Sequence, residues 1–334
     1  MAEDSQERHS HELKHLKSAA LAVALTNKKP VGKKYEEYKD NLVKQLEESG
    51  EEIVGDPKAF YKEGVKSPAG YVIETNQEVF VCYHGTQFGK VFGSGGKEIL
   101  HDLQVSGAKM KFGEEEEVSV HSGFKKEFMA SKASMYNALS QTNAEKKGVH
   151  LSGHSLGAAV AQIAAMDLSI NNPDKWQIKR VTTFGGPRVF QKKAADLYNS
   201  KGLGDVTLRV KQDIDLVTCF GQRGLYHHVG KKIKVPSPKA GVHSGSVYRE
   251  IAKNMKDIDV ENARPSDNPW SFKELYLNPV MQMTKETFAK IQNIGTVVDK
   301  IRATLSSYTK SAASGVNSPM DTPAMRVGNT PPQR

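Results

Sequence analysis

The pentapeptide Gly153-His154-Ser155-Leu156-Gly157 is the strongest indication of how this chain folds, because it places the pattern G-x-S-x-G between two segments of different character. Residues 148–152 before it can end a buried strand. Residues 158–166 after it are mostly alanine and favour a tightly packed helix. The chain must reverse between them within a residue or two, and the two glycines leave room for Ser155 in a strained turn with its hydroxyl exposed at the helix start. That placement suits acyl transfer.

The pentapeptide alone is a weak signal, because glycine and serine are common residues. The alternative is a tight strand-to-helix turn in which Ser155 only caps the helix. The rest of the chain must decide between these two interpretations.

Further segments follow the order of motifs that one family shows. On these segments the chain resembles the class 3 lipases, which are fungal-lipase-like α/β-hydrolases, over roughly residues 60 to 250. The segments are Phe80-Val81-Cys82-Tyr83-His84-Gly85-Thr86, His121-Ser122-Gly123-Phe124, Thr183-Phe184-Gly185-Gly186-Pro187-Arg188-Val189, 209–217 with Asp215-Leu216-Val217, and 243–248 from His243 to Tyr248.

The resemblance implies an α/β-hydrolase fold, in which a mostly parallel central sheet is flanked by helices and the active site lies at the carboxyl ends of the strands. It also implies a serine carboxylic-ester hydrolase that acts on lipids, as a triacylglycerol lipase or a phospholipase, through an acyl-enzyme. Such a serine needs a histidine to take its proton and a carboxylate to orient that histidine. No cofactor or metal is expected.

Two carboxylates are candidates for the acid, Asp213 and Asp215, both just beyond an expected strand at 206–210. The family pattern places the acid before an apolar pair, which favours Asp215 and leaves Asp213 as the alternative.

Three histidines follow the acid, namely His227, His228 and His243. Segment 226–233 resembles a family strand in which a histidine packs structurally. His243 instead follows a proline-containing loop, where catalytic histidines are usually carried. We therefore expect His243 to be the general acid and base.

The oxyanion of a tetrahedral intermediate needs hydrogen-bond donors. One is expected to be the backbone N–H of Leu156, directly after the nucleophile. The family resemblance gives the other as the backbone N–H of Thr86. His84 stands where the family usually has arginine, and we expect this difference to affect loop rigidity and substrate preference more than catalysis.

The segment near 88–98 combines glycines with Phe88, Val91 and Phe92, at the place where family members carry a lid. We expect a lid that opens on lipid. A glycine-rich surface loop without a gating role is the alternative.

We expect four regions along the chain. Residues 1–55 form N-terminal helices that pack on the core, at about 10–26 and 33–49. Residues 56–255 form the catalytic domain. Residues 256–310 form a helical extension, which packs on the core, binds a protein partner or touches a membrane. Residues 311–334 are polar and expected to be disordered.

Composition limits the class of protein. The chain has 334 residues, 38% of them apolar, enough for one full catalytic core. It shows no apolar run of about 18 residues that would suggest a transmembrane segment. Cys82 and Cys219 are expected in core strands, with no disulfide framework and no zinc-ligand spacing.

Charge and the chain's start bear on partners and location. Residues 230–334 hold 16 basic and 9 acidic residues, a net +7 of the total +9. Such a surface favours anionic lipid over nucleic acid, since no nucleic-acid motif accompanies it. We expect a lipid substrate at a membrane or lipid-droplet surface.

The polar N-terminal segment leads us to expect cytoplasmic localisation with peripheral membrane association, or export by a leaderless route. The alternative function is a catalytically weak or inactive module that binds anionic membranes or a protein partner.

Overall fold

The computed structural model of the protein describes residues 50–85, 107–212, 215–221, 225–235 and 260–261, with short pieces at 18–19, 40, 43–44 and 46–47. The chain divides into two compact units, Met1–Leu275 and Tyr276–Arg334, and all described residues lie in the first. The predicted lid, the tail and, apart from 260–261, the C-terminal extension lie outside the described residues. The four predicted regions and their boundaries therefore stay predictions.

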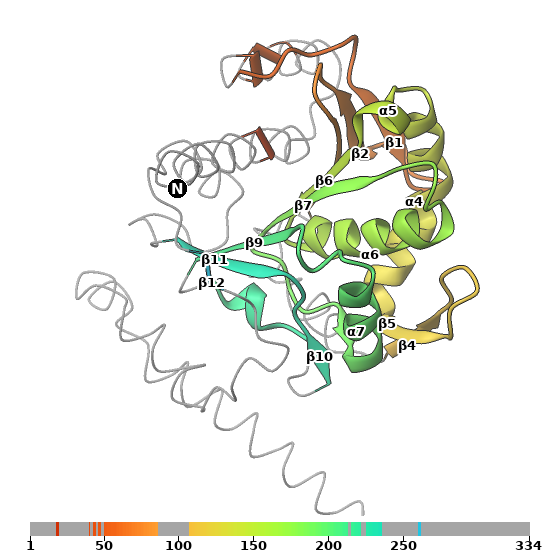
Figure 1. Ribbon diagram of the computed structural model, residues 1–334, viewed down its shortest axis with the longest axis vertical. Helices are drawn as coiled ribbons and strands as arrows, with labels where there is room; N and C mark the ends of the chain where they lie inside the picture. The colour runs from red at the N-terminus through yellow and green to blue at the C-terminus, as the bar shows by residue number, and fades with distance from the viewer. Residues whose placement is uncertain are drawn as a thin grey trace, which may run out of the picture. The chain divides into compact units, whose positions relative to one another are not determined.

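A mostly parallel sheet organises the described part of the chain (Figure 1). Its eight described strands lie in the order β1-β2-β3-β6-β7-β9-β11-β12. The neighbours β3, β6, β7, β9 and β11 are parallel, whereas β1, β2 and β12 join antiparallel. The strands are β1 (Lys58–Tyr61), β2 (Pro68–Glu74), β3 (Val79–Tyr83), β6 (Val149–His154), β7 (Ile178–Phe184), β9 (Thr207–Gln212), β11 (Lys231–Val235) and β12 (Val260–Glu261). The predicted sheet is confirmed.

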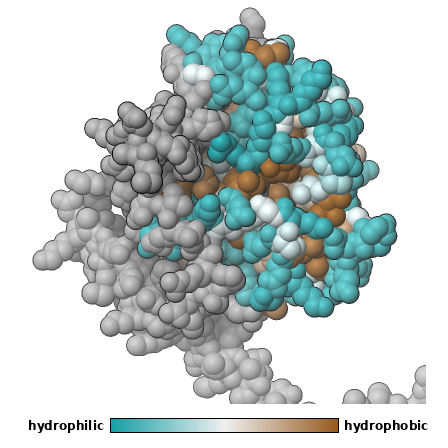
Figure 2. Space-filling view, in the orientation of Figure 1, coloured by the Kyte–Doolittle hydropathy of each residue, from teal (hydrophilic) through white to brown (hydrophobic). Residues whose placement is uncertain are grey.

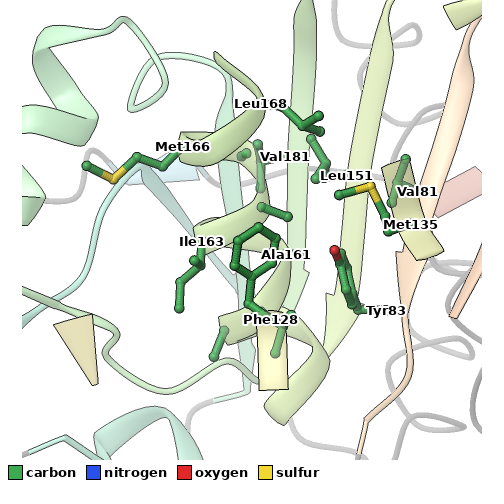
Figure 3. Close-up of a cluster of buried hydrophobic side chains, with 14 of the residues drawn as sticks. Val81, Tyr83, Phe128, Met135, Leu151, Ala161, Ile163, Met166, Leu168 and Val181 are labelled. Atoms are coloured by element: carbon green, nitrogen blue, oxygen red, sulfur yellow. The ribbon is translucent and has the colours of Figure 1, made fainter. Parts of the chain in front are cut away.

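Helices α6 and α4 cover one face of this sheet. Helix α6 (Leu156–Asn171) packs on β3, β6 and β7, and α4 (Ser122–Ser140) packs on α6, β1 and β2. Every residue of α6 from Gly157 to Leu168 is buried, because small side chains let the helix lie between the sheet and α4. Figure 3 shows the resulting core, in which Met135 of α4 lies beside Leu151 of the sheet and Phe128 of α4 lies beside Ala161 of α6.

The opposite face of the central strands is also buried but carries polar groups. His150 on β6 lies with Nδ1 3.3 Å from Glu78 Oε1 and with Nε2 2.8 Å from Thr182 Oγ1. Its ring lies 4.8 Å from that of Phe80. Side chains of a strand alternate between faces, so β6 presents apolar Leu151 to α6 and polar His150 to the other side.

A smaller sheet lies beside the first, in the described order β10-β8-β5-β4. Its strands pair antiparallel, and β5, β8 and β10 pack against helix α7 (Lys192–Ser200). Helix α5 (Ala144–Lys147) precedes β6 of the larger sheet. The strands are β4 (Gly107–Met110), β5 (Val118–His121), β8 (Phe190–Gln191) and β10 (Tyr226–His227).

Two expectations from the sequence are wrong. Segment 226–233 is not one strand, because Gly230 takes a φ of +80° and separates β10 from β11, which belong to different sheets. Cys219 is not in a core strand but ends the 3-10 helix η2 (Leu216–Cys219), where it is half-buried. Cys82 is buried in β3 as expected, and both thiols are free.

The predicted N-terminal helices are described at few positions. Residues 18–19, 40, 43–44 and 46–47 are helical. Ala19 and Leu46 are buried, and the Ser18 hydroxyl donates to Glu51 Oε1 at 2.9 Å.

The described surface in Figure 2 is mostly hydrophilic, with hydrophobic side chains gathered toward its middle. An apolar share of this kind is usual for protein surfaces. Among the described residues no helix is both long and apolar enough to span a membrane.

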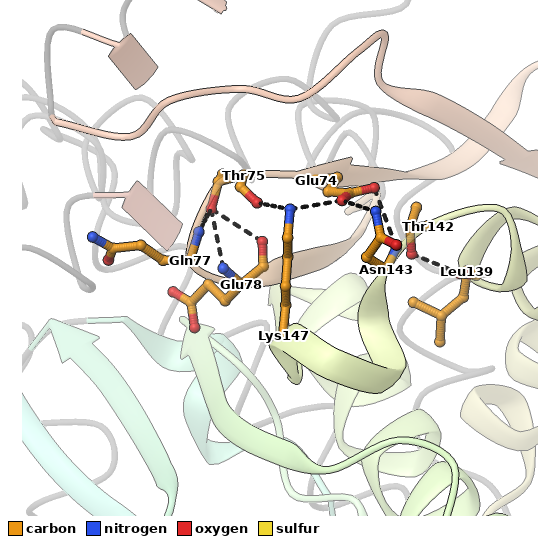
Figure 4. Close-up of polar contacts among 8 residues, drawn as sticks. All are labelled: Glu74, Thr75, Gln77, Glu78, Leu139, Thr142, Asn143 and Lys147. Atoms are coloured by element: carbon orange, nitrogen blue, oxygen red, sulfur yellow. Dashed lines mark hydrogen bonds and ion pairs between the residues drawn. The ribbon is translucent and has the colours of Figure 1, made fainter.

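Glu74, at the end of β2, ties the antiparallel edge of the sheet to α5 (Figure 4). Its carboxylate accepts hydrogen bonds from Lys147 Nζ at 2.7 Å and from Asn143 Nδ2 at 2.8 Å. Lys147 also donates to the carbonyl oxygen of Thr75. Burial by itself would raise the pKa of Glu74, but the bonds from Lys147 and Asn143 lower the pKa below its ordinary value of 4.5.

We predict that Glu74→Gln lowers the free energy of unfolding at pH 7 by about 1 kcal/mol. Because its folded-state pKa is depressed, Glu74 stabilises the fold above pH 4.5, and this contribution is lost as the pH falls through the folded pKa. The variant should therefore lose less stability than the wild type on acidification, as measured by urea unfolding at pH 7 and pH 4. Glu116→Gln, at a side chain that is 89% exposed, is the matched control. Equal pH dependence in both variants would contradict the assignment.

Candidate active site

Ser155 occupies the sharp reversal between β6 and α6. Its φ of 59° and ψ of −123° make it the one non-glycine residue with positive φ among those that the structure describes. The conformation is fixed from both sides. Ser155 N donates to Phe184 O at 2.9 Å, and Ser155 O accepts from Ala158 N at 3.1 Å. The predicted strained turn is present.

The glycines on each side of Ser155 are required by backbone contacts. A Cβ on Gly153 would lie 2.3 Å from the carbonyl group of Gly157, and a Cβ on Gly157 would lie 2.4 Å from Tyr83 O. The carbonyl group of His84 is also within 2.9 Å of that second position. The start of α6 therefore lies directly against the end of β3, three residues before Thr86.

The Ser155 hydroxyl is buried and not exposed as predicted, and its oxygen has no hydrogen-bond partner among the described residues. The serine does not cap α6 with its side chain. It lies at the helix N-terminus, where the helix dipole favours negative charge. The capping alternative raised from the sequence is therefore wrong.

Backbone hydrogen bonds bring the carboxyl ends of three parallel strands together. Ser155, after β6, bonds to Phe184 at the end of β7, and Gly185 N donates to Val210 O of β9 at 3.0 Å. Strand β9 then leads to Asp215 within a few residues. Ser155 and the candidate acid thus follow strands that end at the same edge of the sheet.

Asp215 is buried and is the N-cap residue of η2. Its Oδ1 accepts a hydrogen bond from Val217 N at 3.0 Å, and its carbonyl oxygen accepts one from Thr218 Oγ1 at 2.7 Å. The first bond holds the carboxylate, and the second holds the backbone of Asp215, against the turn that follows it. Asp213, the alternative acid, lies outside the described residues, as do Thr86 and His243.

The two neighbouring candidate histidines differ in environment. His227 is half-buried in β10. His228 is buried, and its Nε2 lies 2.9 Å from the carbonyl oxygen of Thr218. Burial, together with the positive charges of Arg209 and Arg188, holds the pKa of His228 well below its usual range.

The sequence did not indicate that Arg188 supports the turn after Asp215. Arg188 Nη1 donates to Cys219 O, and Arg188 N donates to Phe220 O at 3.0 Å. The side chain is almost fully buried. The sequence signal that could have identified Arg188 is its position directly after Gly186-Pro187, in the loop that follows β7 at the same edge of the sheet.

A second cation lies near the same turn. Burial, and the like charges of Arg209 and Lys232, lower the pKa of Lys211 on β9.

Among the described residues no cluster of histidine, cysteine and carboxylate side chains could hold a metal ion.

A comparison of sequences relates this site to a family. The family described as "Lipase (class 3)" matches residues 81–222, a range that includes the Ser155 turn and Asp215. No curated protein sequence matches the chain significantly.

Solved structures are similar to the chain in fold. A nonglycosylated Yarrowia lipolytica lipase matches with a TM-score of 0.54 at 13% identity, over 81% of this chain and 91% of its own. Lipase II from Rhizopus niveus matches with a TM-score of 0.51 at 18% identity, over 72% and 90%. A lipase from Rhizopus microsporus var. chinensis matches with a TM-score of 0.50 at 17% identity, over 81% and 83%. The predicted α/β-hydrolase fold is confirmed.

We predict that Ser155→Gly is more stable than Ser155→Ala by about 1 kcal/mol. A Cβ at positive φ costs about 1–2 kcal/mol, and the flexibility of glycine in the unfolded chain offsets roughly half of this. Urea unfolding of the two variants measures the difference. Ala161→Gly, inside α6, is the control and should be destabilising. If Ser155→Gly is the less stable of the pair, the turn is not strained.

Proposed function

We propose, on the match of residues 81–222 to the class 3 lipase family, that the chain is a serine hydrolase that cleaves the carboxylic esters of lipids. One observation carries the proposal. Ser155 is held at positive φ at the start of α6, with a hydroxyl that has no hydrogen-bond partner among the described residues. A hydroxyl kept out of structural hydrogen bonds at a helix N-terminus is suited to attack an ester carbonyl.

The proposed triad is Ser155, His243 and Asp215. His243 takes the Ser155 proton as Oγ attacks, and then gives it to the departing alcohol. Asp215 orients the imidazole and stabilises its charged form. Two features support Asp215. It follows β9 at the sheet edge where Ser155 lies, and its carboxylate is buried and held by Val217 N.

The proposed oxyanion donors are the backbone N–H groups of Leu156 and Thr86. Leu156 is the first residue of α6, where its N–H has no partner within the helix. The contact of Gly157 with Tyr83 and His84 supports Thr86, because it brings the chain before Thr86 to the helix start. Together these donors stabilise the oxyanion that forms when Ser155 adds to the carbonyl.

The reaction then proceeds in two halves. Collapse of the first intermediate releases the alcohol and leaves the acyl group on Ser155 Oγ. Water, deprotonated by His243, attacks this acyl-enzyme and releases a fatty acid and free Ser155. Segment 88–98 is proposed as the lid that opens at a lipid surface, and the basic C-terminal region as the part that favours anionic lipid.

We predict that the protein releases fatty acid from phospholipid vesicles or triglyceride emulsion, and that Ser155→Ala abolishes the release. A fluorophosphonate probe should label the wild type and not the variant. The lipid that is hydrolysed faster then separates a phospholipase from a triacylglycerol lipase. An unlabelled, inactive wild type that still binds anionic vesicles would instead favour the membrane-binding module.

We predict that Asp215→Asn lowers kcat roughly 10³–10⁴-fold, because the imidazole loses the carboxylate that orients it. Asp213→Asn is the matched control, two residues away, and should keep wild-type kcat within about twofold. His243→Ala should abolish turnover. The measurement is hydrolysis of a soluble short-chain ester. A large loss in Asp213→Asn with none in Asp215→Asn would reverse the assignment of the acid.

A further inference from the structure

His228 makes a hydrogen bond to the turn that carries Asp215. Its Nε2 lies 2.9 Å from Thr218 O, and a carbonyl oxygen can only accept, so Nε2 carries the proton. The other ring nitrogen, Nδ1, is buried and has no hydrogen-bond partner among the described residues. His228 is therefore a neutral imidazole whose N–H is directed at η2.

Thr218 connects this donor to the backbone of Asp215. Its hydroxyl donates to the carbonyl oxygen of Asp215 at 2.7 Å, while Val217 N donates to Asp215 Oδ1 at 3.0 Å. A shift of Thr218 would displace both contacts. The bond from His228, the residue directly after β10, to Thr218 O fixes the turn independently of these two bonds.

The far end of the same turn is held independently. Arg188 Nη1 donates to Cys219 O, and Arg188 N donates to Phe220 O. A Cβ on Gly221 would lie 2.9 Å from Arg188 Cβ, so the backbone there also packs closely on Arg188. With Arg188 holding the end of the turn, His228 holds its middle.

The groups that face His228 keep it neutral. Burial lowers the pKa of His228, and the positive charges of Arg209 and Lys211 of β9 and of Arg188 in the loop after β7 act in the same direction. These groups disfavour a second proton on Nδ1, so His228 stays neutral and donates to Thr218 O through Nε2–H.

We propose that His228 is a positioning residue, whose Nε2–H fixes the η2 turn through Thr218 O and thereby holds Asp215 in the orientation that the catalytic histidine requires. The inference rests on the proposed function, because it needs Asp215 as the acid. It predicts that the bond affects chemistry and not only stability. A displaced carboxylate stabilises the imidazolium of His243 less, which lowers the pKa of that imidazole and slows acylation.

The test compares two amide substitutions of different length. The longer side chain of His228→Gln places its amide N–H near the position of Nε2 and keeps the bond, whereas the side chain of His228→Asn is too short to reach Thr218 O. His228→Leu removes the donor altogether. The measurements are kcat, KM and the pH dependence of kcat/KM on a soluble short-chain ester. The concentration of active sites comes from fluorophosphonate titration, so unfolded protein does not contribute.

We expect His228→Asn and His228→Leu to lose kcat roughly 10- to 100-fold, with KM within about twofold of wild type. The acid limb of their kcat/KM profile should move to lower pH, because it reports the pKa of the free enzyme's base. His228→Gln should recover kcat and the wild-type acid limb.

If the wild type is active, two results would overturn this inference and leave the proposed function standing. One is a fall in thermal midpoint for His228→Asn with unchanged kcat per active site and an unchanged acid limb, which means a purely structural role. The other is a His228→Gln variant that behaves like His228→Asn. An unlabelled wild type without esterase activity overturns the proposed function first, and the role of Asp215 with it.

Discussion

The geometry of the site follows from one constraint, which is the close approach of β3, β6 and α6 at Ser155. Two peptide groups, those of Gly157 and of Tyr83, occupy the space that side chains at 153 and 157 would need. The chain can reverse there only with glycine at both positions and with the residue between them at positive φ. Since the first turn of α6 begins at this point, the same contact sets the position of the first backbone N–H groups of the helix.

The central sheet turns this local geometry into a site. Parallel strands β6, β7 and β9 end at one edge, and backbone bonds from Ser155 to Phe184 and from Gly185 to Val210 link those ends laterally. The residue after β6 and the turn after β9 are consequently held by the same framework. Arg188 and His228 restrict the turn further, because each donates a hydrogen bond to one of its backbone carbonyl oxygens. The buried Asp215 carboxylate stands at the start of this turn.

Buried polar groups hold the helices and strands that carry this framework. Asp167 of α6 is buried and accepts from Lys132 Nζ at 2.8 Å and from Asn171 Nδ2 at 2.7 Å, while Tyr136 donates to its second oxygen. Because Lys132 and Tyr136 belong to α4, these bonds lock α4 onto the helix that begins at Ser155. A buried carboxylate without such partners would destabilise the fold strongly.

Local patterns in the sequence were enough to predict the glycines around Ser155 as a tight turn, the alanine-rich helix and the apolar strands β3, β6 and β9, because backbone sterics and burial restrict which residues can stand there. They also supplied Ser155 and Asp215 as candidates. They placed 226–233 in one strand, because the pattern does not reveal that Gly230 bends the chain between two sheets. The groups that support the turn after Asp215 emerged from the three-dimensional arrangement alone. Arg188, His228 and Thr218 lie far apart or in unrelated elements along the chain, and their contacts exist because parallel strands end side by side.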